Sequence, residues 1–512
     1  MNSSSAQGVL ELTARDLGPI AEARIDLRPL TVFIGPSNTG KSYLAILIYA
    51  LHRYFSGGGG LGHRLFGSYA QMLGLERNRE VSMDDMDSIV AAANQLLLSE
   101  TDSLSQEDIV LPGVLTDVIR SGLAKQGSLL GNEISRCFGI AEIGALIRKG
   151  ATRNSSVVFR RHDTNDAASV DGQLSIGAQT SEFATTIPEG FRLRLGDDDD
   201  IFDPWALWAL EAARGDGEKK LSKNLAKWRL MRSLVDYSCP QIFGSLTLPA
   251  FYLPADRTGV MHAHRAVVSA LIGSAAMTGL RPAANMATLS GVLADFLEQL
   301  IELDSVSYRR RRSIRGLGAQ IEDAIIGGVI GVDKSEVTGY PHFTYRPKGW
   351  KHSLSLMNAS SMVSELAPVV LYLRYIVQPG HVLIIEEPES HLHPAMQVEF
   401  TRQLAMLVEN GIRVIITTHS EWVLEELSNI VRRSELPARQ AVAGDMGDKV
   451  ALRSGQVGAW LFRQKKRPKG SIVEEIRLDA ETGLYPTGYD DVSEELYNDS
   501  VNIFNRLQNR RP

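Results

Sequence analysis

The chain has 512 residues, of which 44% are hydrophobic and 22% are charged, a composition that excludes a disordered or fibrous protein. Its net charge of −6 excludes a surface that is basic throughout, so contacts with nucleic acid would need local clusters of Lys and Arg. Two cysteines are too few for a disulfide framework. We find no secretory signal at the start and no apolar run long enough to span a membrane. We therefore expect a cytoplasmic protein of about three domains or lobes, without a membrane partner.

The N-terminal segment contains the most specific motif of the sequence. Alternating residues over 9–12 and 22–27 predict short half-buried strands, and the apolar run over 30–34 predicts a buried strand. That run leads into GPSNTGKS, which fits the phosphate-loop pattern G-x-x-x-x-G-K-[ST], and a helix is predicted over 42–55. A glycine-rich loop that binds nothing is the alternative, and the strand and helix on either side argue against it.

The residues of this loop have separate tasks in binding a triphosphate. Gly35 and Gly40 let the backbone bend so that successive amides cradle the phosphates, and the following helix adds its positive end. Lys41 is placed to contact the β- and γ-phosphates, and the Ser42 hydroxyl to ligate Mg²⁺. The predicted nucleotide-binding residues in the loop are Gly35, Pro36, Ser37, Asn38, Thr39, Gly40, Lys41 and Ser42.

A long insertion without a recognisable motif follows, over residues 61–246. Its first part, through Gly139, has a helical pattern, and the stretch 155–195 alternates like antiparallel strands. Asp197–Asp200 predict a solvated acidic loop, and the pattern is helical again over 205–237. We therefore expect a largely helical insertion with an antiparallel β part.

Serines mark the start of a helix predicted within 358–377. Ser360, Ser361 and Ser364 lie where this helix begins, and Pro368, tolerated only near a first turn, places its start close to Ser364. A helix N-terminus that carries serines is an anion site. The alternative is an ordinary N-cap cluster on a core helix.

Two predicted strands end in polar residues that suit phosphate chemistry. The apolar run 382–385 leads into Glu386 and Glu387, and we assign the first carboxylate to the metal and the second to the attacking water. A second run ends at His419, whose neutral imidazole can hydrogen-bond a γ-phosphate oxygen. The alternatives are two acids that merely end a strand and a structural histidine.

Taken in order, these four elements resemble ABC-type ATPases of the SMC/RecF/OLD group over roughly residues 8–50 and 350–425. The stretches SSMVSEL, EEPESHLHP and TTHS are similar to those of prokaryotic OLD-like ATPases in phage-defence systems, including the ATPase subunit of Septu. The resemblance implies an α/β fold: an ABC-type ATPase head with a mixed or parallel sheet, flanking helices and an antiparallel β lobe, plus the largely helical insertion. The expected segments are 1–60 with the phosphate loop, 61–246 as the insertion, 247–350 as a return strand and helical lobe, 351–435 as the second part of the head, and 436–512 as a β/helical extension.

The resemblance also implies a site shared between two copies. In this group two heads sandwich two ATP molecules, so Ser360 and Ser361 of one copy would contact ATP held by Lys41 and Ser42 of the other. Glu387 would be the catalytic carboxylate and His419 a γ-phosphate switch, with Lys41 completing the catalytic set. His391 and His393 are spaced like metal ligands, but this motif favours a place at the dimer seam.

The sequence departs from the group's pattern at three places. Glu386 replaces the usual Asp, so its metal contact would pass through water, and Met362 replaces the usual glycine of the serine motif. The glutamine loop has no clear counterpart. We assign the strand and turn over 251–257 to the position of the glutamine loop, and this assignment predicts that Arg257 lies at the rim of the site.

These features favour an ATP-hydrolysing dimer that acts as a sensor or scaffold in anti-phage defence and controls a separate effector, a nuclease or a toxin. The alternative is a RecF/SMC-like DNA-repair ATPase that clamps DNA. Basic clusters at 309–315 and 463–469 are candidates for holding nucleic acid, although each is equally well explained as a solvated surface. A transporter subunit, a small-molecule kinase and a fused nuclease fit the motif order less well.

Overall fold

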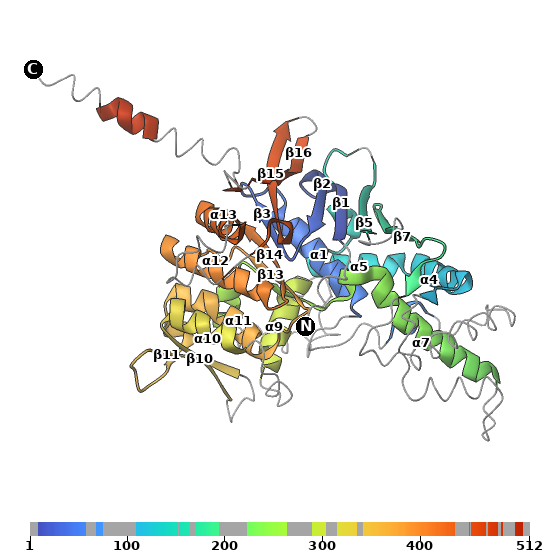
Figure 1. Ribbon diagram of the computed structural model, residues 1–512, viewed down its shortest axis with the longest axis horizontal. Helices are drawn as coiled ribbons and strands as arrows, with labels where there is room; N and C mark the ends of the chain where they lie inside the picture. The colour runs from blue at the N-terminus through green and yellow to red at the C-terminus, as the bar shows by residue number, and fades with distance from the viewer. Residues whose placement is uncertain are drawn as a thin grey trace, which may run out of the picture.

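A large mixed sheet runs through the computed structural model of the chain (Figure 1). The structure describes residues 9–57, 68–74, 109–151, 153–162, 169–193, 223–263, 289–303, 315–334, 341–435, 450, 452–466, 469–479, 483–484 and 497–504. The strands of the large sheet are β1 (Val9–Leu17), β2 (Ile20–Leu27), β3 (Leu30–Ile34), β5 (Ser155–His162), β6 (Ser169–Ile176), β7 (Ser181–Thr186), β9 (Ala250–Leu253), β13 (Val382–Glu386), β14 (Arg413–Thr418), β15 (Val457–Lys466) and β16 (Lys469–Ile476). Their order in the 11-stranded sheet is β7-β6-β5-β1-β2-β16-β15-β3-β14-β13-β9.

The two halves of this sheet differ in strand direction. Strands β9, β13, β14, β3 and β15 are parallel neighbours, whereas β2, β1, β5, β6 and β7 pair antiparallel. The central parallel strands are apolar runs because helices cover them on both faces, and β3 and β13 are buried throughout. This arrangement confirms the predicted α/β fold class, a mixed sheet with an antiparallel β lobe and flanking helices.

Helices cover both faces of the parallel half. The principal helices are α1 (Lys41–Phe55), α4 (Gly113–Lys125), α5 (Gly127–Phe138), α7 (Lys223–Phe243), α9 (Gly291–Glu302), α10 (Arg315–Ile321), α11 (Ser361–Tyr375), α12 (Pro394–Glu409) and α13 (Glu421–Glu435). Phe33 of β3 packs into the core that contains α1, while its neighbours Val32 and Ile34 pack into the core that contains α11, α12 and α13. Each such buried side chain contributes about 1.5–3 kcal/mol.

The remaining described strands form small sheets. One sheet joins β10 (Gly328–Lys334), β11 (Pro341–Pro347) and β12 (Leu354–Ser355). Two further pairs join β4 (Ile109–Val110) with β8 (Arg192–Leu193) and β17 (Leu478–Asp479) with β18 (Gly483–Leu484). None of the helices in the described residues is long and apolar enough to cross a membrane.

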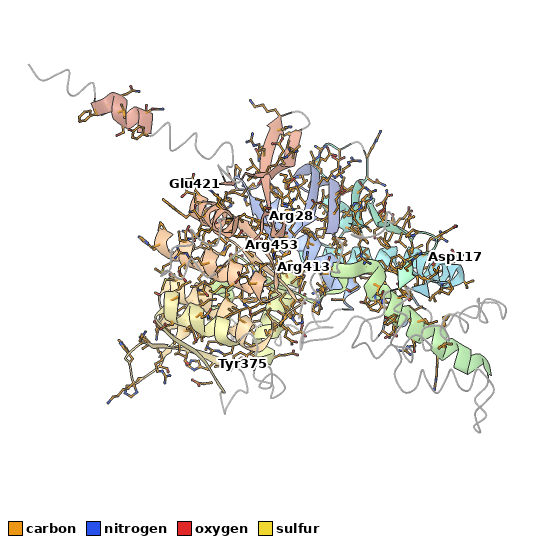
Figure 2. The ribbon with its side chains drawn as sticks, in the orientation of Figure 1. Arg28, Asp117, Tyr375, Arg413, Glu421 and Arg453 are labelled. Atoms are coloured by element: carbon orange, nitrogen blue, oxygen red, sulfur yellow. The ribbon has the colours of Figure 1, made fainter. Side chains whose placement is uncertain are left out.

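Arginines fix the edge of the sheet opposite the carboxyl ends of the parallel strands, and Figure 2 labels two of them. Arg28 donates from Nη1 to the Val457 carbonyl at 2.8 Å and from Nη2 to Glu475 at 2.5 Å. Arg413 donates to the Leu27 carbonyl at 2.6 Å, and burial lowers its pKa to about 10. These contacts hold β2, β3, β14 and β15 in register at one end, which leaves the other end for a site.

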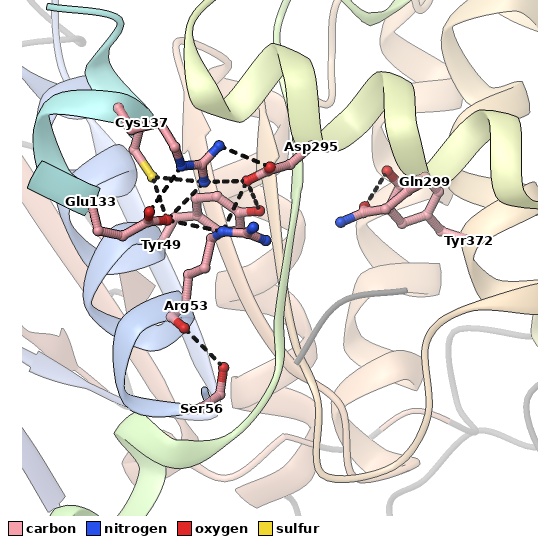
Figure 3. Close-up of polar contacts among 9 residues, drawn as sticks. Tyr49, Arg53, Ser56, Glu133, Cys137, Asp295, Gln299 and Tyr372 are labelled. Carbon is pink, nitrogen blue, oxygen red and sulfur yellow. Dashed lines mark hydrogen bonds and ion pairs between the residues drawn. The ribbon is translucent and has the colours of Figure 1, made fainter. Parts of the chain in front are cut away.

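A buried polar network links helix α1 to helix α11 through α9 (Figure 3). Arg53 on α1 and Arg136 on α5 both contact Asp295 on α9, at 3.3 and 2.8 Å. One turn further along α9, Gln299 accepts a 2.7 Å hydrogen bond from Tyr372 of α11. Because buried charges are stable only when paired, this network fixes the relative positions of the four helices α1, α5, α9 and α11.

One predicted boundary is wrong. Helix α11 begins at Ser361 rather than close to Ser364, and it contains Pro368 in its interior. Ser360 caps it, since its side chain accepts a hydrogen bond from the Val363 amide at 3.4 Å. The helix is buried continuously from Val363 onwards for several turns, and this burial outweighs the hydrogen bond that proline cannot make.

The predicted insertion contains the expected helices and antiparallel strands. Helices α4, α5 and α7 are present, and β5, β6 and β7 pair antiparallel. These strands extend the large sheet, which takes strands from all five predicted segments. The acidic run 197–200, the helical pattern over 205–222 and the basic residues 309–312 lie outside the described residues. The segment boundaries remain predictions.

Candidate functional site

A cavity of about 840 Å³ opens beside the phosphate loop. Strands β3, β14 and β13 are parallel neighbours, so the residues that follow them meet at one edge of the sheet. The cavity is lined by 37–42 of the loop and by Glu387 and His419, which follow the other two strands. The turn 18–19, residues between 145 and 149, and residues of the β15–β16 hairpin also line it. The structure thus brings together three of the four motifs found in the sequence.

The loop has the backbone geometry that phosphate binding needs. Gly35 and Gly40 have φ angles of 146° and 100°, which side chains disfavour. A Cβ at Gly35 would lie 2.4 Å from the Phe462 carbonyl oxygen, and one at Gly40 would lie 2.6 Å from Ile20. Gly40 is also the N-cap of α1 and offers no side chain to its first amides. These amides are left to bind an anion, so the loop fits a triphosphate.

Lys41 lies folded against its own loop. Its ammonium group donates hydrogen bonds of 2.8 Å to the Gly35 carbonyl and 2.9 Å to the Pro36 carbonyl. Burial lowers the pKa of Lys41 to about 8, although the nearby carboxylates of Glu387 and Glu389 oppose this shift. If a triphosphate bound, its charged oxygens would replace these two neutral carbonyls as partners of the Lys41 ammonium group. Bound triphosphate would therefore favour the protonated form of Lys41.

This pKa predicts that ATP affinity falls as pH rises. Without nucleotide, Lys41 loses its proton as pH passes about 8, whereas bound phosphate holds the proton on. Raising pH from about 7 to 9 should therefore weaken ATP binding about tenfold. Calorimetric titration at constant ionic strength measures this change. The Lys41→Met variant should bind weakly at both values, and an unchanged affinity in the native chain would contradict the prediction.

Glu387 and His419 face each other in the cavity. Nε2 of His419 lies 3.7 Å from Oε1 of Glu387, and the Ser390 hydroxyl donates a 3.4 Å hydrogen bond to the same carboxylate. Glu387 has a φ of 42°, a left-handed conformation that costs a residue with a side chain about 1–3 kcal/mol. Burial lowers the pKa of His419, and the positive Lys41 lowers it further, so the imidazole is neutral at neutral pH.

Glu386 lies away from this cavity. Its side chain is buried, and its carboxylate accepts a 3.2 Å hydrogen bond from the Ala255 amide. It does not line the cavity with Ser42, so its assignment to the metal remains a prediction. Within the described part of the chain, no group of three or more His, Cys, Asp and Glu residues could hold a metal ion, and His391 and His393 belong to none.

Glu389 is a site residue that the sequence analysis missed. Its Oε1 accepts hydrogen bonds from the Thr418 hydroxyl at 2.8 Å and from the His419 amide at 2.6 Å. Burial raises the pKa of Glu389. The carboxylate therefore anchors the strand end that carries His419. Its position two residues after Glu387 is the signal that points to it.

The serines lie outside the cavity of their own chain. Ser360 and Ser361 are exposed at the start of α11, whereas Ser364 is buried and contacts His262 at 3.0 Å. Neither exposed serine lines the cavity. Arg257, expected at the rim, is fully buried and does not line the cavity either.

Comparison with protein families matches one part of the chain. A family model described as an AAA ATPase domain matches residues 323–424, which include α11, Glu387 and His419. Among curated proteins, no sequence matches the chain.

Solved structures of SMC heads are similar in outline. An SMC head bound to the C-winged helix domain of ScpA has 9% identity and a TM-score of 0.40, covering 92% of this chain and 98% of that one. The SMC head domain from Thermotoga maritima has 11% identity and a TM-score of 0.34, covering 92% and 100%. The head from Pyrococcus furiosus with an extended coiled coil, bound to the C-terminal domain of ScpA, has 10% identity and a TM-score of 0.37, covering 96% and 99%.

The class of protein follows from the fold and the site. A phosphate loop ends a buried parallel strand, and a carboxylate and an imidazole from neighbouring strands share its cavity. Together with the AAA ATPase domain match over residues 323–424, this arrangement supports an ATPase with a phosphate loop.

Proposed function

We propose that the chain hydrolyses ATP as a dimer, with two sites at the seam between the copies. One observation carries this proposal: Lys41, Glu387 and His419 line one cavity, while Ser360 and Ser361 are exposed outside it. A site that includes the serines then needs a second copy of the chain.

The residues of the cavity divide the work of hydrolysis. The loop amides and Lys41 bind the phosphates, and His419, held by Glu389, hydrogen-bonds a γ-phosphate oxygen. Glu387 orients a water molecule and takes its proton as the water oxygen bonds to the γ-phosphorus. The bond to the bridging oxygen breaks, which releases ADP, and the proton passes to phosphate. Bound Mg²⁺ would supply charge neutralisation, and the Ser42 hydroxyl, which lines the cavity, would hold it.

The dimer requirement is tested by dilution. Below the dissociation constant of the dimer, ATPase activity per milligram of protein should fall steeply, because two half-sites must meet. A steady-state assay over a thousandfold range of protein concentration, at saturating ATP, measures this. The Lys41→Ala variant, expected to lose ATP binding, gives the background. Activity strictly proportional to protein concentration across that range would contradict action in trans.

The biological role that we infer is that of a nucleotide-gated sensor or scaffold in anti-phage defence, acting on a separate effector such as a nuclease or a toxin. The similarity of the SSMVSEL, EEPESHLHP and TTHS stretches to OLD-like ATPases supports this role. ATP at the seam would hold the dimer closed and hydrolysis would release it, which is a suitable signal for an effector.

A DNA-clamping repair ATPase is the second candidate, favoured by one surface feature. The β15–β16 hairpin projects from the sheet (Figure 1), and Lys465, Lys466 and Lys469 are exposed near its tip. Glu474 lies 3.7 Å from Lys465 and offsets part of this charge. Retention of DNA at low salt and its release at high salt would favour this candidate over the first.

A further inference from the structure

Arg257 is a fully buried arginine at the junction of three elements. It follows β9, and its guanidinium group donates from Nη1 to the Glu386 carbonyl at 2.6 Å and to the Pro254 carbonyl at 3.0 Å. Nη2 donates to the Glu387 carbonyl at 3.2 Å. Nε donates to the Glu365 carbonyl of α11 at 3.2 Å. One side chain therefore joins the end of β9, the end of β13 and the first turns of α11.

An ion pair completes this junction. Nη2 of Arg257 lies 2.5 Å from Oε1 of Glu365, whose side chain is 1% exposed and also accepts a hydrogen bond from the Thr258 hydroxyl. Burial lowers the pKa of Arg257, and Glu365 and Glu386 oppose that shift. A buried ion pair often adds no more stability than well-packed apolar side chains would. Its geometry, rather than its stability, is therefore the feature that needs an explanation.

The geometry fixes the conformation of Glu387. The Glu386 carbonyl belongs to the peptide before the Glu387 Cα, and the Glu387 carbonyl belongs to the peptide after it. Arg257 holds both, so it restrains the φ and ψ angles of Glu387 together. This residue has the left-handed φ of 42°, a conformation that persists only where surrounding contacts enforce it. These two angles set the direction in which the carboxylate enters the cavity.

The other end of the junction is the serine helix. Glu365 lies one turn after Ser361, on a helix that is buried from Val363 onwards and capped by Ser360. A shift of this helix moves Glu365, and the ion pair and the Nε hydrogen bond carry the shift to Arg257. We propose that Arg257 is a positioning residue, which couples contact between the serines and the partner copy's ATP to the orientation of Glu387 in its own cavity. This coupling rests on the proposed function, and it would make each site sense the state of the other.

Removing both charges tests this role without leaving one of them buried and unpaired. In the double variant Arg257→Met/Glu365→Gln, we expect a folded protein that binds ATP with native affinity, because the phosphate loop is untouched. Its kcat should fall about 10- to 100-fold, as expected when a catalytic group is misplaced by about 1 Å. Any cooperativity between the two sites, measured as the Hill coefficient for ATP, should be lost. Native kcat and cooperativity in this folded variant would overturn the proposal.

Two further variants keep the test decisive. Arg257→Lys keeps a charge for Glu365 but lacks the fork that holds two carbonyls, so native binding with reduced kcat is expected even if the double variant does not fold. The matched control, Arg374→Met/Glu322→Gln, removes another ion pair of α11, at 2.6 Å, and should lower the melting temperature without changing kcat. Native kcat in Arg257→Lys would overturn the proposal. A native chain that does not hydrolyse ATP at all would instead overturn the proposed function, and this inference with it.

Discussion

Replacing Glu387 by glutamine is expected to reduce kcat by about two to four orders of magnitude while ATP stays bound, because a neutral amide cannot accept a proton from water. Glutamine has nearly the same shape, and the contacts of this side chain with Ser390 and His419 can be kept. The phosphate loop and Lys41 are unchanged, so ATP binding should be retained. Because hydrolysis no longer opens the seam, the ATP-bound dimer should accumulate, and light scattering after gel filtration measures it.

A matched control separates this effect from a general loss of negative charge. Glu425 is exposed on α13 and does not line the cavity, so Glu425→Gln should leave both kcat and the monomer–dimer equilibrium unchanged. Native turnover in the Glu387→Gln variant would show that another group activates the water, and Glu389 would then be the carboxylate to test. A variant that is inactive and also fails to bind ATP would point to damage in the phosphate loop.

The parts of the site that the sequence predicts are those encoded in contiguous motifs. The phosphate loop, the acids at the end of β13 and the histidine after β14 each lie within a few residues of an apolar run. Parallel strands then bring their carboxyl ends to one edge, and the strand order β13-β14-β3 makes these three neighbours. Local sequence patterns and one rule of sheet geometry are therefore sufficient to predict that Lys41, Glu387 and His419 lie in one site.

The orientation of the two adjacent acids could not be predicted in the same way. Successive residues of a strand point to opposite sides, so one of Glu386 and Glu387 must turn away from the cavity. The sequence does not say which, because both follow the same apolar run. The left-handed φ of Glu387 and the Ala255 amide that holds Glu386 decide it, and both depend on the tertiary fold.

Contacts between segments that are distant in the sequence could not be predicted from it either. Arg257 contacts Glu365 and the backbone of Glu386 and Glu387, which lie more than a hundred residues further along the sequence. An arginine after an apolar strand is typical of an exposed position, since burying its charge requires acceptors that no local pattern shows. The same reason explains why Pro368 is tolerated in the interior of α11, because the burial that offsets its missing hydrogen bond depends on packing against other segments.

Combining two inactive variants is expected to restore ATP hydrolysis. Ser361→Arg should be inactive, because a bulky cation replaces the hydroxyl that is proposed to reach the partner's ATP, and Lys41→Ala should be inactive because it does not bind ATP. In a mixed dimer, one site combines Lys41 from the first variant with Ser361 from the second and is intact. Half of the dimers in an equal mixture are mixed and each has one good site, so the activity should reach at most about a quarter of the native value. The proposed coupling through Arg257 lowers it further, because the second site of a mixed dimer holds no ATP.

Exposure of Ser361 makes the substitution interpretable, since an arginine there meets solvent in the single chain and leaves the core untouched. Ser121→Arg on α4 is the matched control, an exposed helical serine in the insertion, and should remain fully active. Restored activity in the mixture requires that the two residues act on one ATP from different copies, because neither variant contains a complete set. Full activity of Ser361→Arg alone, or no recovery in a mixture proven to form mixed dimers, would mean that the serine end of α11 has no part in the partner's site.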